Sequence, residues 1–147
     1  MNFALTEQQE RIRDAIAKIC ARFDDQYWFD RDHDGRFPEE LYRALADDGW
    51  LGMCIAEQYG GSGLGITEAA IMMQTIAQSG GGMSAASSVH INLFGLNPVA
   101  VFGNEEQRAR MLPPVARGTA KSCFGVTEPN TGLNTTQLKL RAERRGD

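Results

Sequence analysis

The sequence has 147 residues and a formal net charge of −4 at pH 7, from 15 Lys and Arg against 19 Asp and Glu. This length fits one ordinary domain, or one domain and the start of another. A mildly acidic chain lacks the dense basic surface that binds phosphate backbones, which argues against a nucleic-acid partner. Three widely spaced cysteines predict neither a disulfide framework nor a metal site. Acidic residues near the start exclude a secretory signal, and no run approaches the ~18 apolar residues of a membrane span. We therefore expect a cytoplasmic globular protein.

The first segment has the pattern of an amphipathic helix over residues 7–23. Thr6 and Gln9 fit a capping box, in which each side chain satisfies the other residue's backbone N–H. Apolar residues then recur at helical spacing: Ile12, Ile16, Ile19 and Phe23. The charged stretch 24–36 is interpreted as a loop with at most a short helical turn.

Further helices follow. Pro38 suits the first position of a second helix, and Gly49 suits a left-handed stop after it. Thr67 is expected to cap a third helix that ends at 80–82, and residues 84–94 to form a fourth.

The last helical part is a short helix opened by Pro98 and then a helix that begins at a second capping box. That box pairs Asn104 with Gln107. The two prolines, Pro113 and Pro114, are expected to stop the helix just beyond Met111.

The pattern changes after Gly118. Residues 121–126 are expected to form a strand, and residues 137–142 alternate polar with apolar side chains, as a second strand would. Strands without partners cannot satisfy their backbone groups. The sequence therefore predicts a mainly α fold, with an α-helical domain over 1–118 and the incomplete beginning of a β domain over 119–147.

The glycine cluster 61–65 has two interpretations. A phosphate-binding dinucleotide loop needs a buried strand before it and a helix N-terminus at it. Residues 56–59 make a poor buried strand, so a flexible connector between helices is the preferred interpretation.

The segment 124–132 also has two interpretations. A threonine hydroxyl and several backbone N–H groups meet a tight turn whose path is set by Pro129 and Gly132, and such a turn could offer directional donors to a flat heterocycle. By spacing alone it could equally be the corner of a hairpin.

Residues 123–129, Cys-Phe-Gly-Val-Thr-Glu-Pro, followed by Gly132, resemble the flavin-binding signature of the acyl-CoA dehydrogenase family. The resemblance extends in order over nearly the whole chain, through Leu-Thr-Glu-Gln-Gln at 5–9, Gly-Trp-Leu-Gly at 49–52, the loop 57–65 and Phe-Gly-Asn-Glu-Glu-Gln at 102–107. It implies an N-terminal helical-bundle domain followed by the first strands of a truncated β-barrel, and a third, helical domain outside this chain.

The resemblance also implies a site for FAD. Val126 and Thr127 would donate hydrogen bonds to the pyrimidine edge of the flavin ring, with Phe124, Gly132 and Leu133 alongside. The family commonly has a serine where this chain has Leu133, and that serine contacts the flavin phosphate and the pantetheine arm of the ligand. Leu133 could keep only a main-chain contact to cofactor or substrate.

The fourth helix lines the acyl pocket in the family. By position, Ser87, His90 and Ile91 would border the substrate, although His90 is at least as readily a helix histidine packed against its neighbours. Glu128 belongs to the turn in the family, whose catalytic base is a carboxylate in the C-terminal domain. No catalytic residue is therefore assigned in this chain.

The activity implied is α,β-dehydrogenation of an acyl-CoA thioester by a homo-oligomeric enzyme, with an electron-transferring flavoprotein as acceptor and with residues 1–147 inactive by themselves. Two alternatives stay open. Leu133 allows an acyl-CoA oxidase or flavin monooxygenase relative, and an exposed strand edge at 137–142 allows a non-catalytic helical assembly module.

Overall fold

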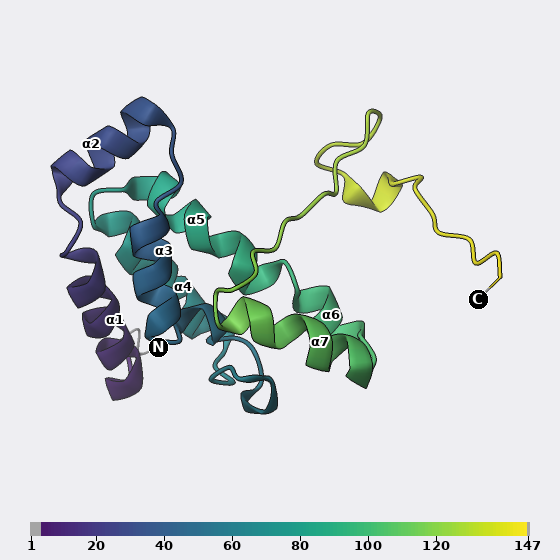
Figure 1. Ribbon diagram of the computed structural model, residues 1–147, viewed down its shortest axis with the longest axis horizontal. Coiled ribbons are helices and arrows are strands. Elements are labelled where there is room, and N and C mark those ends of the chain that lie inside the picture. The colour runs from purple at the N-terminus through teal and green to yellow at the C-terminus, as the bar shows by residue number, and fades with distance from the viewer. Residues whose placement is uncertain (1–3, 147) are drawn as a thin grey trace.

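The computed structural model describes residues 4–146, and its helices gather on one side of the molecule while the carboxyl-terminal segment runs away from them (Figure 1). The α-helices are α1 (Glu7–Cys20), α2 (Asp25–Asp34), α3 (Glu39–Asp47), α4 (Ile66–Gln78), α5 (Gly82–Phe94), α6 (Asn97–Phe102) and α7 (Glu105–Ala116). Three short 3₁₀ helices are η1 (Trp50–Gly52), η2 (Glu57–Tyr59) and η3 (Thr135–Gln137). The expected mainly α fold is confirmed.

The main core lies where α1 and α5 pack on α4, with α3 and η1 closing it. The apolar stripe of α1 is confirmed, because Ile12, Ile16 and Ile19 are all buried. Its capping box is confirmed as well, with the Gln9 backbone N–H donating to the Thr6 hydroxyl at 3.2 Å. A second, smaller cluster joins η2 to α7 and contains Ile55, Tyr59, Leu112, Val115 and Ala116.

The region 24–36 is a ten-residue helix, so its interpretation as a loop is wrong. The Asp24 carboxylate caps α2 by accepting from the Tyr27 N–H at 2.9 Å, and Gly35 ends it at φ 68°. Only one residue of α2, Trp28, is buried, so the helix lacks the apolar stripe that a sequence pattern detects. Tertiary contacts stabilise it instead: the Tyr27 hydroxyl donates to Glu40 at 2.8 Å.

Burial, with that hydrogen bond to Glu40, raises the pKa of Tyr27 to about 12. The tyrosine therefore remains a hydrogen-bond donor throughout the neutral range.

Helix α4 begins two residues earlier than expected, so the prediction that Thr67 caps it is wrong. Gly65 is the N-cap, and the Glu68 carboxylate accepts from its backbone N–H at 3.1 Å. The same carboxylate accepts from the Gln9 side chain at 2.9 Å, which joins the beginning of α4 to α1. These hydrogen bonds lower the pKa of Glu68, the one from Gln9 most. Gly49 does adopt the expected left-handed conformation, with φ 79°.

Helix α7 runs through Pro113 and Pro114 to Ala116, so the expectation that these prolines stop it is wrong. Each proline removes the N–H that would donate to the carbonyl four residues earlier, so the helix loses two intrahelical bonds here. Their carbonyls still accept from Arg117 and Thr119, at 3.1 and 2.9 Å. The last turn is retained because Leu112, Val115 and Ala116 are buried. The capping box of Asn104 and Gln107 is confirmed.

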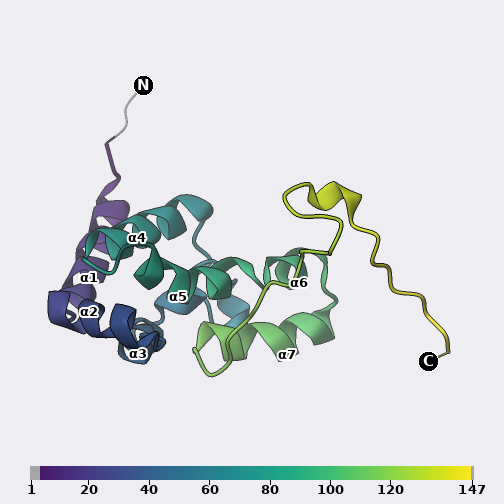
Figure 2. The same cartoon turned by 90° about the horizontal axis from the view of Figure 1, so that it is seen from above.

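The strands expected at 121–126 and 137–142 are not formed: residues 4–146 contain no β-strand, only an isolated bridge between Glu128 and Thr131. Figure 2 shows the reason, since the segment after α7 leaves the helices with no second extended segment beside it. A ladder needs a partner for each backbone donor and acceptor, so an extended segment by itself remains unpaired.

One stretch, Gly82–Phe102, is long and apolar enough by composition to cross a membrane, although the sequence analysis expected none. Such evidence is weak, because a core helix of a soluble protein meets the same criterion. In the structure the stretch is two helices, α5 and α6, separated at 95–96.

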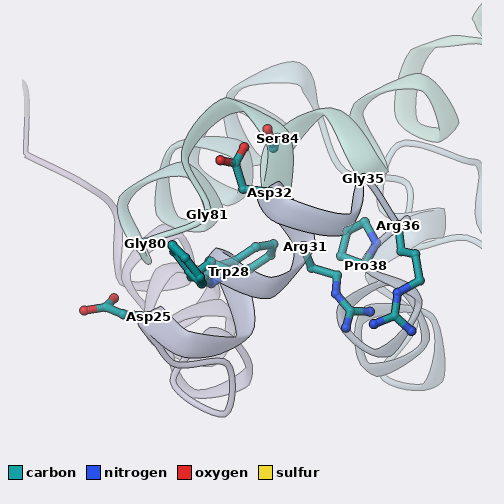
Figure 3. Close-up of a pocket in the computed structure, with 11 residues that line it drawn as sticks. Asp25, Trp28, Arg31, Asp32, Gly35, Arg36, Pro38, Gly80, Gly81 and Ser84 are labelled. Carbon is teal, nitrogen blue, oxygen red and sulfur yellow. The ribbon is translucent and has the colours of Figure 1, made fainter.

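The turn between α4 and α5 lies directly against the Trp28 indole (Figure 3). A Cβ atom added at Gly81 would stand 2.7 Å from two ring carbons of Trp28 and 2.5 Å from the Ala85 Cβ. Side-chain carbons do not approach so closely, so only glycine lets this turn close over the indole.

We therefore expect Gly81→Ala to destabilise the chain by about 1–3 kcal/mol, the usual cost of an overpacked site. The φ of Gly81 is −75°, which alanine adopts without strain, so by backbone entropy alone the substitution would stabilise. Urea unfolding followed by circular dichroism measures the change. Gly132→Ala, where the new Cβ meets nothing within 4 Å, is the control. Equal stability of the two variants would contradict the packing argument.

Candidate functional site

A mostly apolar groove lies between α4 and α5, with a volume of about 450 Å³. Ser87, His90 and Phe94 line it from α5, and Ala70 and Met73 from α4. Ser87 and His90, two of the residues predicted to border the substrate, are therefore brought to one cavity. The third, Ile91, does not line it; its side chain is half-buried and its carbonyl accepts from the Ser122 hydroxyl at 2.8 Å.

Cys54 also lines the groove, from the segment before α4. Its Sγ donates weakly to the Gly65 carbonyl at 3.7 Å, and burial, with Glu68 nearby, raises the pKa of the thiol. The thiol is therefore held neutral, and it contributes a small apolar surface rather than a nucleophile.

Three aromatic rings connect the groove to the predicted flavin segment. The His90 and Phe94 ring centroids are 4.4 Å apart, and Phe94 meets Phe124 edge to face at 5.3 Å. Phe124 is half-exposed, so one side of its ring remains open. The structure thus places a residue predicted for the cofactor at the end of the groove that holds those predicted for the substrate.

The segment that follows Phe124 presents donors that have no acceptor among residues 4–146. Within residues 4–146, no group accepts from the backbone N–H of Val126 or from the Thr127 hydroxyl. Val126 is half-buried and Thr127 is exposed. Directional donors that follow an aromatic ring in contact with an apolar groove suit a flat, acceptor-rich heterocycle, so the residues present fit a flavin ring.

A closed turn follows these donors. Glu128 and Thr131 exchange two backbone hydrogen bonds of 3.0 Å, which confirms the predicted turn. The Glu128 carboxylate accepts from the N–H groups of Lys139 and Leu140, at 2.9 and 2.7 Å. Glu128 therefore stabilises the turn and is occupied by backbone donors.

Gly132 and Leu133 lie on this turn, and both are exposed. The Leu133 side chain is fully exposed, and its carbonyl accepts from the Thr135 N–H at 3.1 Å. The leucine makes no packing contribution to the helical core, so its side chain is free to meet another molecule.

The start of the segment is held against the helices by polar contacts. Asn92 of α5 accepts from the Ser122 backbone N–H at 3.0 Å and donates to the Tyr42 hydroxyl. Lys121 pairs with Glu39 at 2.6 Å, and its Nζ lies 4.7 Å from the Tyr42 ring centroid. The hydrogen bond from Lys121 lowers the pKa of Glu39, and burial raises that of Tyr42.

The larger cavity, of about 580 Å³, lies elsewhere, between α2 and the turn before α5 (Figure 3). Its charged lining residues are of both signs: Asp25, Arg31, Asp32 and Arg36. It contains none of the predicted site residues. The smaller groove is the better candidate because Ser87 and His90 line it and Phe124 contacts its Phe94.

The glycine loop 60–65 is a connector, as preferred, and offers no phosphate cradle. The N–H groups of Ser62, Gly63 and Leu64 donate to the carbonyls of Gly52, Ile55 and Met53. At Gly61 a Cβ would stand 2.0 Å from the Ile55 carbonyl oxygen. These contacts hold the loop in one path, so its expected flexibility is not what the structure shows.

A family model described as the N-terminal domain of acyl-CoA dehydrogenase matches residues 6–119. The chain belongs to the acyl-CoA dehydrogenase family. It is 32% identical to a probable acyl-CoA dehydrogenase, YngJ, of Bacillus subtilis, over 100% of this chain and 38% of that protein. The chain thus spans less than half the length of this curated relative.

Solved structures that are similar to this chain have the same fold. A glutaryl-CoA dehydrogenase from Mycobacterium smegmatis superposes with a TM-score of 0.81 at 28% identity, over 100% of this chain and 38% of that one. An electron transferring flavoprotein structure from Acidaminococcus fermentans, described for flavin-based electron bifurcation, superposes with a TM-score of 0.78 at 28% identity, over 93% of this chain and 36% of that one.

Two site residues escaped the sequence analysis. Asn92 continues the buried stripe of Ala85 and Val89 at helical spacing, so an amide on an apolar face was a detectable signal. Phe94 had no such signal, because its contact with Phe124 joins two residues far apart in the chain.

Proposed function

We propose that this chain forms the helical domain and the flavin-ring contacts of an FAD-dependent acyl-CoA dehydrogenase. The observation that carries the proposal is the pair of unused donors at Val126 and Thr127, next to Phe124 at the end of an apolar groove. Membership of the family supports it. The proposed domains are 1–118 and 119–147, the second incomplete in this chain.

In this proposal the groove binds the acyl chain. Its walls include Ala70, Met73 and Ala86, and no Asp, Glu, Lys or Arg lines it, so it favours an apolar chain over water. Ser87 and His90 border the chain, and Ile91 acts from behind them by holding Ser122. A dry groove also strengthens the hydrogen bonds that polarise a thioester carbonyl.

The other residues hold the cofactor. Val126 and Thr127 donate to the pyrimidine edge of the ring, where such donors stabilise the negative charge of the reduced form. Phe124 packs beside the ring, and Gly132 and Leu133 offer main-chain contacts to the phosphate region. When bound, FAD supplies the acceptor for the hydride that leaves the β carbon of the acyl group.

The proton from the α carbon requires a carboxylate base. No Asp or Glu lines the groove, and Glu128 is occupied by two backbone N–H groups. We therefore assign the base to protein outside this chain. We also propose that the enzyme is a homo-oligomer in the cytoplasm and that an electron-transferring flavoprotein is its electron acceptor.

One rival is an acyl-CoA oxidase or flavin monooxygenase relative. Leu133 favours it, because a fully exposed leucine cannot supply the hydroxyl contact of the usual serine. The assembly-module alternative loses its main support, since residues 137–142 form no strand edge.

The flavin site is tested by Thr127→Val, which removes one donor and keeps the shape of the side chain. We expect FAD binding to weaken about fivefold, the effect of about 1 kcal/mol from one hydrogen bond. Quenching of FAD fluorescence on titration with the 147-residue chain measures this. Thr136→Val, which removes a hydroxyl bonded only to Asn134, is the matched control. An equal affinity in both variants would remove Thr127 from the site.

The groove is tested by Ser87→Trp, which places a large ring at its wall. We expect the affinity of the chain for octanoyl-CoA to fall at least about tenfold, because the indole occupies volume that the acyl chain needs. Ser84→Trp is the control, on the same helix but facing the larger cavity. Calorimetric titration measures both. Unchanged octanoyl-CoA affinity in Ser87→Trp would assign the acyl chain elsewhere.

The reaction is tested with the product of the whole gene. We expect octanoyl-CoA to reduce an artificial electron acceptor without oxygen uptake, and the 147-residue chain to be inactive because it lacks the base. Oxygen consumption with hydrogen peroxide release would favour the oxidase instead. Turnover by the isolated chain would show that a base lies within it.

A further inference from the structure

Asn92 is a buried amide on an otherwise apolar face of α5. It is only 4% exposed, and it follows Ala85, Ala86 and Val89 on the side of the helix that faces the core. A buried amide is costly unless its donors and acceptor are satisfied. Its partners therefore indicate what the residue contributes.

Those partners lie on two separate parts of the chain. The Asn92 Oδ1 accepts from the Ser122 backbone N–H at 3.0 Å, and the Nδ2 donates to the Tyr42 hydroxyl at 2.5 Å. The Nδ2 also approaches the Ala120 carbonyl oxygen at 3.4 Å. One side chain thus joins α3, α5 and the segment that leaves the helical domain.

Ser122 lies in close contact with the end of α5. Its hydroxyl donates to the Ile91 carbonyl at 2.8 Å, and a Cβ on Gly95 would stand 2.7 Å from the hydroxyl oxygen. Gly95 therefore leaves the space that lets the segment lie against the end of α5.

Ser122 is also where hydrogen bonding to the helices ends. From residue 123 to 146, no hydrogen bond joins the segment to α1–α7, although Phe124 meets Phe94 edge to face. The donors at Val126 and Thr127 lie only a few residues further on. An extended chain rises about 3.3 Å per residue, so the direction set at Ser122 decides where those donors stand.

We propose that Asn92 is a positioning residue for the flavin contacts: its amide fixes the register and direction of residues 122–127 relative to α5, whose Phe94 lines the groove. The inference rests on the proposed function, because it assigns a purpose to the placement of Val126 and Thr127. Asn92 touches neither cofactor nor substrate and acts through Ser122.

The test compares Asn92→Leu with Thr75→Val in the 147-residue chain. The leucine keeps the approximate size of the side chain and removes the amide, and Thr75 is a buried hydroxyl whose only hydrogen bond is to Ile71 in its own helix. We expect the leucine variant alone to expose the Ser122 amide to solvent, with its protection against hydrogen exchange falling at least about tenfold by NMR. We also expect its dissociation constant for FAD to rise at least about tenfold, against less than twofold for Thr75→Val.

Two further variants distinguish loss of this hydrogen bond from misfolding of the chain. Ser122→Pro removes the N–H that Asn92 binds, and also the hydroxyl that donates to Ile91, while every buried side chain of α5 is kept. It should therefore weaken FAD binding as Asn92→Leu does. Asn92→Asp keeps an oxygen for the Ser122 N–H and should restore protection and FAD affinity to within about threefold of the parent chain.

Two outcomes would overturn the inference. One is a protected Ser122 amide in Asn92→Leu. The other is lost Ser122 protection in Asn92→Leu while the FAD affinity stays unchanged in both Asn92→Leu and Ser122→Pro. Failure of the parent chain to bind FAD would contradict the proposed function. Hydrogen exchange of the Ser122 amide would then be the measurement that decides whether Asn92 holds the segment.

Discussion

The burial of one face of α5 against α4 is the constraint on which the site depends. Ala85, Ala86 and Val89 are small enough to let the two helices approach, and each is buried. Because this face is fixed, the residues a part-turn away, Ser87 and His90, must line the groove, and Asn92 must point into the core. A helix has only one rotation that buries its apolar stripe, so core packing and site geometry are set together.

The segment after Ser122 combines two properties that have one cause. Within residues 4–146 it forms no strand because no neighbouring segment completes a ladder, and the Val126 backbone N–H has no acceptor for the same reason. Unsatisfied backbone groups persist only where they are exposed or meet another molecule. The turn closed by Glu128 limits this freedom, since its carboxylate binds two N–H groups further along. A short run of available donors is thus bounded by a hydrogen bond to α5 at one end and a closed turn at the other.

Local chemistry made much of the helical domain predictable. Capping boxes at Thr6 and Asn104 depend on residues three apart, and the stripe of α1 depends on a single periodicity. The failures share a different cause. Helix α2 is stabilised by Trp28 in the core and by Tyr27 on Glu40, and α7 passes two prolines because its last turn is buried. In each case contacts between distant residues outweighed local propensity.

The sequence by itself determined the family, the helical class and the motif that carries the candidate flavin contacts, because these depend on residue types at short spacing. Only the tertiary structure decided which of the predicted residues share a site. It placed Ser87 and His90 on the groove and brought Phe94 into contact with Phe124. It also showed that the Ile91 carbonyl accepts a hydrogen bond from Ser122. It also revealed Asn92 as the link between helix and segment. The physical reason is that burial and hydrogen-bond partners are properties of the packed chain. The structural role of a buried amide depends on the groups that form its hydrogen bonds.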